Sequence, residues 1–182
     1  MLQVVVPGGE YWDEKKEEML YFKDVHLKLE HSLISISKWE SIWHVPFIGS
    51  GKTEEQTISY LQCMSLNPDV PFDVFERLVR HPTVYKKVID YISNPMTAST
   101  ISSIEDSKKP SRQVVTSELI YFWMSSFGIP FEAEKWHINR LIMLIRIASE
   151  ENKPKKKQSR SDILAKYNRI NEMNRAKFKS NG

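Results

Sequence analysis

The segment from Val115 to Ile147 most constrains how this chain can fold, because it contains two consecutive helical patterns of large apolar side chains. Their three- and four-residue spacing places these side chains on one face of each helix. Between the patterns, Gly128 suits the left-handed residue that ends a helix, and Pro130 prevents continuation. We expect a helical hairpin whose apolar surface forms the core, a partner surface, or both. Its apolar positions are Leu119, Ile120, Trp123, Met124 and Phe127, then Trp136, Leu141, Ile142, Leu144, Ile145 and Ala148.

The remaining patterns predict a mostly α fold: a helical domain with a short N-terminal β-hairpin and a C-terminal basic helix. Residues 2–6 form a β-branched run, and the partly alternating residues 19–29 can pair with it, whereas we expect residues 10–13 to form a loop. Further helices are expected from His31, Thr53, Pro71 and Pro82. The spacing of Thr53 and Gln56 is that of a capping box, and proline suits the first turn of a helix.

Size and composition are those of a globular protein. The chain has 182 residues, of which 41% are hydrophobic and 27% charged, enough to bury a core. A single cysteine, Cys63, excludes an internal disulfide framework and fits a reducing compartment. We find no secretory leader and no apolar run of membrane-spanning character. The sequence therefore predicts a soluble, cytoplasmic protein without a membrane segment.

Charge divides the chain into two parts. Residues 1–152 hold 16 Lys/Arg and 21 Asp/Glu, whereas residues 153–182 hold 10 Lys/Arg and 2 Asp/Glu. An acidic body of net charge −5 is thus followed by a basic segment of net charge +8. We expect a mainly helical core domain with an N-terminal β segment over 1–152, then a basic linker and C-terminal helix over 153–182. That helix has an apolar stripe of Ile163, Leu164, Tyr167, Ile170 and Met173.

Motifs that would indicate catalysis, nucleotide binding or metal binding are incomplete. The run from Gly49 to Thr53 ends like a phosphate-binding loop, but Pro46 occupies the position of the required first glycine. Glu134 and His137 have the spacing of metal ligands on one helical face, but no second such pair exists. No arrangement of nucleophile and base is evident. The sequence therefore predicts no enzyme, no cofactor and no metal.

Tryptophan and basic residues are the candidates for partner binding. Five tryptophans are many for a domain of this size, and tryptophan often anchors interfaces, although core packing explains most of them equally well. The basic segment suits an acidic or helical protein. It also suits nucleic acid, but we expect this partner less, because an apolar stripe lies beside the basic residues. The candidate partner-binding residues are Trp39, Trp43, Trp123, Trp136, Lys155, Lys156, Lys157, Lys166, Tyr167 and Arg169.

Several short motifs occur together over nearly the whole chain. They are Glu30-His31-Ser32-Leu33, Ser37-Lys38-Trp39-Glu40, Pro46-Phe47 before Lys52-Thr53, Pro95-Met96-Thr97-Ala98, Thr116-Ser117-Glu118 with Tyr121, Ile129-Pro130-Phe131, and Lys135-Trp136-His137-Ile138-Asn139-Arg140-Leu141. This combination resembles the small tail assembly chaperones that tailed bacteriophages encode near the tape-measure gene. Residues 136–141 are the most specific part of the resemblance.

The resemblance implies a non-catalytic morphogenesis factor in the host cytoplasm. Such chaperones coat the long helical tape-measure protein until tail-tube subunits replace them. The implied partner is thus the tape-measure protein or another tail protein, with self-association left open. Two other interpretations remain: a structural tail or baseplate component of the virion, or a nucleic-acid-binding regulator that acts through residues 153–182.

Overall fold

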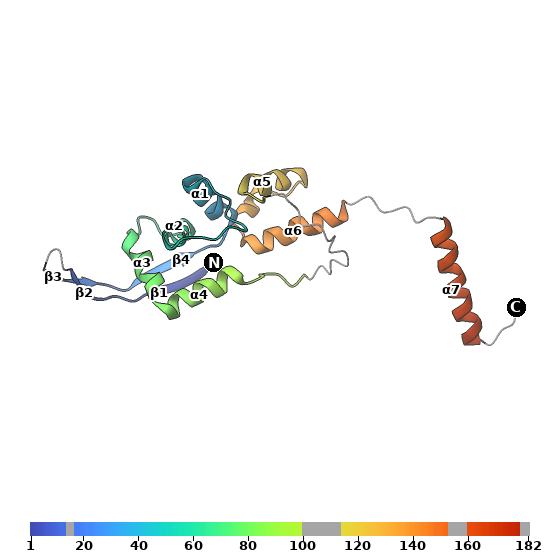
Figure 1. The fold of residues 1–182 in the computed structure, drawn as a ribbon, viewed down its shortest axis with the longest axis horizontal. Helices are drawn as coiled ribbons and strands as arrows, with labels where there is room; N and C mark the ends of the chain where they lie inside the picture. The colour runs from blue at the N-terminus through green and yellow to red at the C-terminus, as the bar shows by residue number, and fades with distance from the viewer. Residues whose placement is uncertain (14–16, 100–113, 153–159, 179–182) are drawn as a thin grey trace. The chain divides into compact units, whose positions relative to one another are not determined.

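The computed structural model describes residues 1–182 except 14–16, 100–113, 153–159 and 179–182. It divides into two compact units, Met1–Glu150 and Glu151–Gly182. The described residues are mostly helical, with strands near the N-terminus, which confirms the predicted fold class (Figure 1). No helix in the described part of the chain combines the length and apolarity needed to cross a bilayer.

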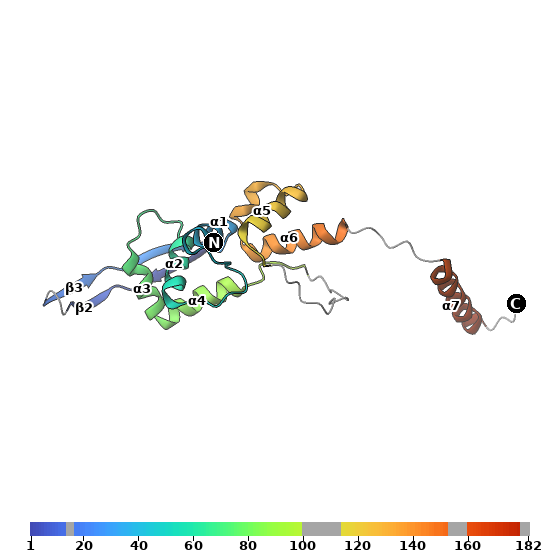
Figure 2. The same ribbon diagram turned by 45° about the horizontal axis from the view of Figure 1, so that its top comes forward.

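The strands form one long antiparallel ribbon. Strand β1 (Leu2–Val6) pairs with β4 (Val25–Leu29), and β2 (Gly9–Asp13) pairs with β3 (Glu18–Phe22). Val6 lies opposite Val25 and Gly9 lies opposite Phe22, so both pairs share one register. The expected loop at residues 10–13 is therefore wrong, because these residues belong to β2. The β1–β4 half lies among the helices, and the β2–β3 half extends beyond them (Figure 2).

A glycine allows the two halves of the ribbon to join. A side chain at Gly8 would place its first carbon 2.2 Å from the carbonyl oxygen of Phe22, a distance that no side chain tolerates. The Gly8 amide also donates a hydrogen bond to Asp24 Oδ1 at 2.7 Å. The close approach of the two backbones therefore requires glycine at this position.

Four helices pack around the β1–β4 half: α1 (Leu33–Trp43), α2 (Glu54–Met64), α3 (Phe72–Arg80) and α4 (Pro82–Ser93). The predicted capping box of Thr53 and Gln56 is confirmed, with both reciprocal hydrogen bonds present. Alternate residues of the two strands, Val4, Val6, Leu27 and Leu29, are buried beneath the helices. The core therefore lies between one face of this half-ribbon and the surrounding helices.

The predicted helical hairpin is present, but its helices do not pack along their lengths. Helix α5 (Ser117–Ser126) is followed by the 3-10 helix η1 (Phe131–Lys135) and by α6 (Ile138–Glu151). Thr116 caps α5, and Gly128 has the predicted positive φ, 64°. Helix α5 packs against α1, and a groove separates it from α6. Trp136 lies between η1 and α6 and so belongs to neither helix, contrary to the prediction.

The second unit contains helix α7 (Arg160–Phe178). Its side chains are exposed wherever they are described, including Leu164, Tyr167, Ile170 and Met173 from the predicted apolar stripe. The expected basic C-terminal helix is thus present over these residues.

Candidate protein-binding surface

The start of α5 is fixed to α1 by a buried carboxylate. Glu40 Oε2 accepts a hydrogen bond from the Ser117 amide at 2.8 Å, and Oε1 accepts one from the Phe47 amide, also at 2.8 Å. Both amides would otherwise lack partners at the start of a helix and in a turn, and a carboxylate is a strong acceptor for them. Glu40 therefore joins α1, the loop that follows it and the start of α5.

The turn after α5 is held equally firmly. Gly128 adopts the left-handed conformation, and the Ile129 amide donates to the Met124 carbonyl oxygen at 2.8 Å. The Tyr121 hydroxyl then donates to Glu134 Oε2 at 2.8 Å, which fastens η1 to α5. Burial, together with this hydrogen bond, raises the pKa of the Tyr121 hydroxyl, so it remains a donor at neutral pH.

The start of α6 is fixed to segments far away in the sequence. The Ile138 amide donates to the His31 carbonyl oxygen at 2.8 Å. The Asn139 side-chain amide donates to the carbonyl oxygens of Ile92 at 3.1 Å and Asn94 at 2.8 Å. These bonds connect α6 to the β4–α1 junction and to the end of α4. The positions of α5 and α6 are therefore set by the core rather than by contact between the two helices.

Two histidines meet beneath α6 as neutral side chains. The imidazole rings of His31 and His137 lie 5.0 Å apart, and the His31 Nδ1 atom is hydrogen-bonded to the Tyr60 hydroxyl. Burial is the main cause that lowers the pKa of His31 to about 3, and burial also lowers the pKa of His137. A charged imidazole is therefore unfavourable here, and the pair serves packing and hydrogen bonding at neutral pH.

The groove between α5 and α6 has a volume of about 410 Å³ and is mostly apolar. Trp123 and Phe127 line it from α5, and Ile142 and Ile145 line it from α6. Its cationic lining residue is Arg146, for which the described part of the chain supplies no ion pair or hydrogen bond. The remaining lining residues are Ile48, Val115 and Ser149.

Large aromatic side chains are also exposed on α5 and on η1. Phe122 on α5 is 64% exposed, and Phe131 in η1 is 57% exposed. Burying such side chains against a partner removes large apolar areas from water, at about 25 cal/mol per Å². Phe122 and the groove-lining side chains of α5 belong to an aromatic, nearly uncharged surface, which we call the α5 surface: Leu119, Phe122, Trp123, Ser126 and Phe127.

The predicted tryptophans occupy different environments. Trp39 has no exposed surface, and its indole N–H donates to the Gln56 carbonyl oxygen at 2.8 Å, so it is a core residue and not a surface anchor. Trp43 is half-buried and donates to Ser59 Oγ at 3.1 Å. Trp123 lines the groove. Trp136 is 39% exposed, with the Arg140 guanidinium 4.7 Å from its ring centre. Of the four, Trp123 and Trp136 remain candidates for binding.

The predicted basic residues lie in the second unit. Lys166, Tyr167 and Arg169 are exposed on α7. Lys155, Lys156 and Lys157 lie outside the described residues. The described residues therefore give no reason to assign Lys166, Tyr167 and Arg169 to one site with the four tryptophans.

The loop that resembles a phosphate-binding motif uses its lysine internally. Lys52 Nζ donates to the Phe47 carbonyl oxygen at 2.8 Å and lies 3.8 Å from the centre of the Phe47 ring. Burial lowers the pKa of this ammonium group. Lys52 thus closes the loop before α2, and in this conformation it does not extend into solvent.

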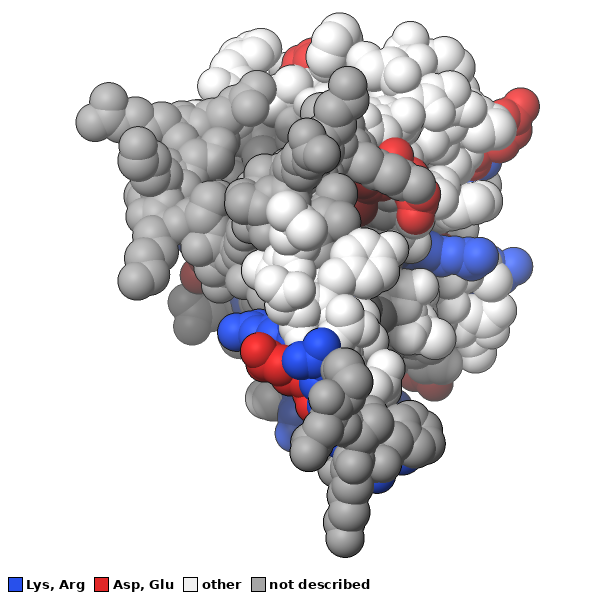
Figure 3. Space-filling view, turned by 90° about the vertical axis from the view of Figure 1, so that its right-hand side faces the viewer, with Lys and Arg blue, Asp and Glu red and all other residues white. Residues whose placement is uncertain are grey.

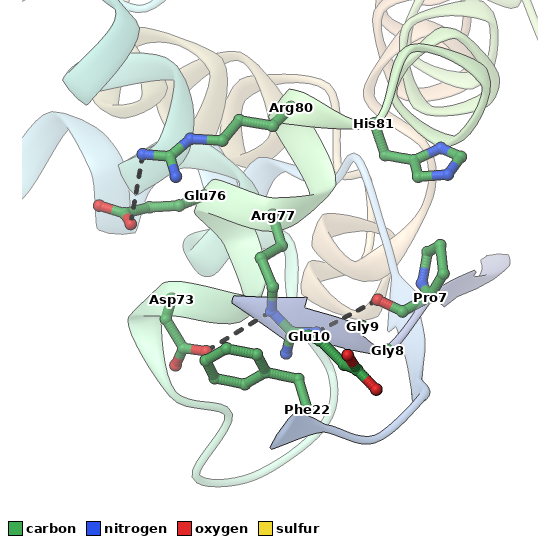
Figure 4. Close-up of a pocket in the computed structure, with 10 residues that line it drawn as sticks. All are labelled: Pro7, Gly8, Gly9, Glu10, Phe22, Asp73, Glu76, Arg77, Arg80 and His81. Atoms are coloured by element: carbon green, nitrogen blue, oxygen red, sulfur yellow. Dashed lines mark hydrogen bonds and ion pairs between the residues drawn. The ribbon is translucent and has the colours of Figure 1, made fainter. Parts of the chain in front are cut away.

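A second cavity, of about 580 Å³, lies where the ribbon meets α3 (Figure 4). Arg77 is its central residue: the guanidinium lies 4.6 Å from the Phe22 ring centre, donates to the Pro7 carbonyl oxygen at 3.2 Å and pairs with Asp73 at 3.6 Å. Arg80 pairs weakly with Glu76 at 3.9 Å. No sequence motif predicts this cavity, although the run Pro7-Gly8-Gly9 is a local signal for a close approach of the backbone there. Its acidic and basic side chains are largely paired with one another, so we interpret it as the joint that holds the ribbon to α3.

Reactive or metal-binding side chains in the described residues outside these regions are the remaining candidates for a site. Within the described ranges, no group of three or more His, Cys, Asp or Glu residues is placed to hold a metal ion. Cys63 is a half-buried free thiol, and burial raises its pKa, which disfavours the reactive thiolate. The α5 surface is therefore the strongest candidate for function.

Comparison with known protein families, with curated proteins and with solved structures finds no match.

Proposed function

We propose that this protein is a non-catalytic chaperone that holds an amphipathic helix of another protein in the groove between α5 and α6. The observation that carries the proposal is a rigidly positioned apolar groove beside exposed aromatic side chains. Grooves between helices commonly bind the apolar face of a partner helix, with side chains at i, i+3, i+4 and i+7 as anchors.

The sequence resemblance supplies the class of partner. It points to the helical tape-measure protein of a tailed bacteriophage, bound in the host cytoplasm during tail assembly. The motifs that carry the resemblance include Glu40, Ser117 and the segment 136–141, and these residues position α5 and α6 in the structure. The residues that carry the sequence resemblance and the residues that shape the groove are therefore partly the same, and this agreement supports the proposal.

The groove also defines what the partner helix must offer. Its apolar lining favours leucine, isoleucine or aromatic side chains. Arg146, which has no ion pair with the residues that the structure describes, favours an acidic residue beside them. A helix with an apolar stripe flanked by glutamate or aspartate meets both requirements. The same chemistry disfavours a strongly basic partner at this surface.

Co-expression with the tape-measure protein encoded in the same genome tests the proposal. We expect the two proteins to co-purify, and we expect Ile142→Glu to weaken capture at least about tenfold because it places a carboxylate in the apolar groove. Gln62→Glu adds the same charge to an exposed position of α2 and is the matched control. Unchanged capture by a folded Ile142→Glu variant would exclude the groove.

Two further experiments separate this proposal from its rivals. Mass spectrometry of purified phage particles detects a structural tail or baseplate component, whereas an assembly chaperone is absent from the finished particle. A salt titration of DNA binding, with and without residues 153–182, detects a nucleic-acid regulator. Retention in particles would favour a structural component over a chaperone. Strong, salt-dependent DNA binding would favour a nucleic-acid regulator.

A further inference from the structure

Helix α5 presents a protruding aromatic side chain next to the groove. At 100° per residue, Phe122, Ser126, Leu119, Trp123 and Phe127 follow one another in that order around the helix. Phe122 is exposed at one edge of this face, and Trp123 and Phe127 line the groove at the other. The same helix therefore carries an exposed ring and an apolar cavity about a third of a turn apart.

The α5 surface is also suited to meet an identical surface, because it carries little charge. Residues 119–131 contain no Asp, Glu, Lys, Arg or His. In Figure 3, the described side chains at the upper right of the face turned to the viewer are mostly uncharged, with acidic side chains at the edges of this area. By contrast, β2 and β3 carry Glu10, Asp13 and Glu18, and α7 is strongly basic, so two copies meeting there would bring like charges together.

We propose that two copies of this protein associate through their α5 surfaces about a two-fold axis, with Phe122 of each copy entering the α5–α6 groove of the other. A two-fold contact uses the same patch on both molecules, so an exposed ring and a cavity on one helix satisfy each other reciprocally. With the two α5 helices antiparallel, Glu118 in the first turn of one lies near the C-terminal end of the other. The two Glu118 carboxylates are then kept apart.

This inference does not depend on the identity of the partner in the proposed function. It does use the same groove, and the dimer and a helical partner therefore compete for it. A patch of this size buries less than the roughly 1,600 Å² of a standard interface, so the dimer is weak and reversible. Such a dimer keeps Phe122 and the groove out of water until a partner helix replaces the second copy.

Sedimentation velocity of the full chain over a concentration series up to about 0.5 mM measures the association. We expect a monomer–dimer equilibrium for the unaltered protein. We expect Phe122→Ser to weaken it at least about tenfold, because the central aromatic anchor is lost. Ser126→Glu, which adds a charge one helical turn from Phe122, should weaken it similarly.

Two controls keep the test specific. Tyr21→Ser removes an aromatic side chain that is 72% exposed on β3, and Gln62→Glu adds a charge on α2. Both should leave the dimer unchanged, and circular dichroism melting curves verify that every variant is folded. A monomeric protein at the highest concentration overturns the proposal. So does a dimer that survives both α5 variants, or one that either control weakens as much as Phe122→Ser does.

Discussion

Helices α1 and α5 are both short, uncharged over most of their length and rich in aromatic residues, yet they differ in how far other elements cover them. Helix α1 is covered by α2, by η1 and by α5 itself, and Trp39 at its centre is completely buried. Helix α5 packs on α1 along one face, while Phe122 remains exposed and Trp123 lines an open groove. The contrast indicates that the apolar side chains of α5 exceed what the core uses, and this excess is available for binding.

Truncation of Trp39 should produce the largest effect on stability. Removing a fully buried tryptophan side chain leaves a cavity and removes the indole hydrogen bond to the Gln56 carbonyl oxygen, so we expect Trp39→Ala to lower the free energy of unfolding by about 3–5 kcal/mol. Urea unfolding followed by circular dichroism measures this loss. A loss below about 1 kcal/mol would show that Trp39 is not packed in the core and that α1 is not covered as described.

Removing the Glu40 side chain should come next, because this residue fixes α5 to α1. Glu40→Ala leaves the Ser117 and Phe47 amides without their acceptor, and we expect a loss of about 3 kcal/mol. The same urea titration measures it. Glu40→Gln, which keeps one acceptor oxygen, should lose less than the alanine variant. Equal losses for the two variants would contradict the two-bond role of this carboxylate.

Acidification should weaken the core through the buried histidines. The pKa of His31 in the folded state, about 3, lies below its ordinary value of 6.5, so the unfolded chain binds the proton more readily. The contribution of neutral His31 to the free energy of unfolding is therefore fully present above about pH 6.5 and is lost as the pH falls toward 3. Between pH 6.5 and 4.5 we expect His31 to contribute a loss of about 2–3 kcal/mol.

His31→Gln tests the source of this pH dependence. The glutamine side chain stays neutral throughout, so the variant should lose less stability on acidification than the unaltered protein does, by about the contribution of His31. Urea titrations of both proteins at pH 7.0 and pH 4.5 provide the comparison. Parallel losses in the two proteins would assign the pH dependence to other groups.

The smallest effect is expected at the exposed ring of α5. Phe122→Ala should change the free energy of unfolding by no more than about 0.5 kcal/mol, because most of this side chain is already in water. Thermal and urea unfolding at low protein concentration check the monomer. A loss close to that of Trp39→Ala would show that Phe122 supports the core, and the contrast between the two helices would fail.

Local signals in the sequence predicted much of the fold. The capping box of Thr53 and Gln56 and the left-handed Gly128 each depend on a few neighbouring residues, and each is confirmed. The strand β2 was missed because residues 10–13 show no apolar alternation. Their pairing follows from the register that β1 and β4 set farther along the ribbon.

The candidate site was predictable only in part, because exposure depends on distant segments. Helical periodicity identified apolar faces around Trp39 and Trp123 alike, but it does not reveal which face another element covers. The groove exists because His31 and Ile92 fix the start of α6, and both contacts join residues far apart in the sequence. The cavity around Arg77, where the ribbon meets α3, likewise depends on a contact between residues far apart in the sequence, Arg77 and Pro7.

Hydrogen exchange with the tape-measure protein present and absent tests the central claim most directly, because it reports on every backbone amide at once. We expect the added partner to slow exchange in α5 and α6 and to leave α2 and α3 unchanged. We also expect Ile142→Glu to remove this protection while the variant keeps its native exchange elsewhere. Protection confined to the ribbon or to α7, with α5 and α6 unaffected, would contradict the assignment of the α5–α6 groove as the binding surface.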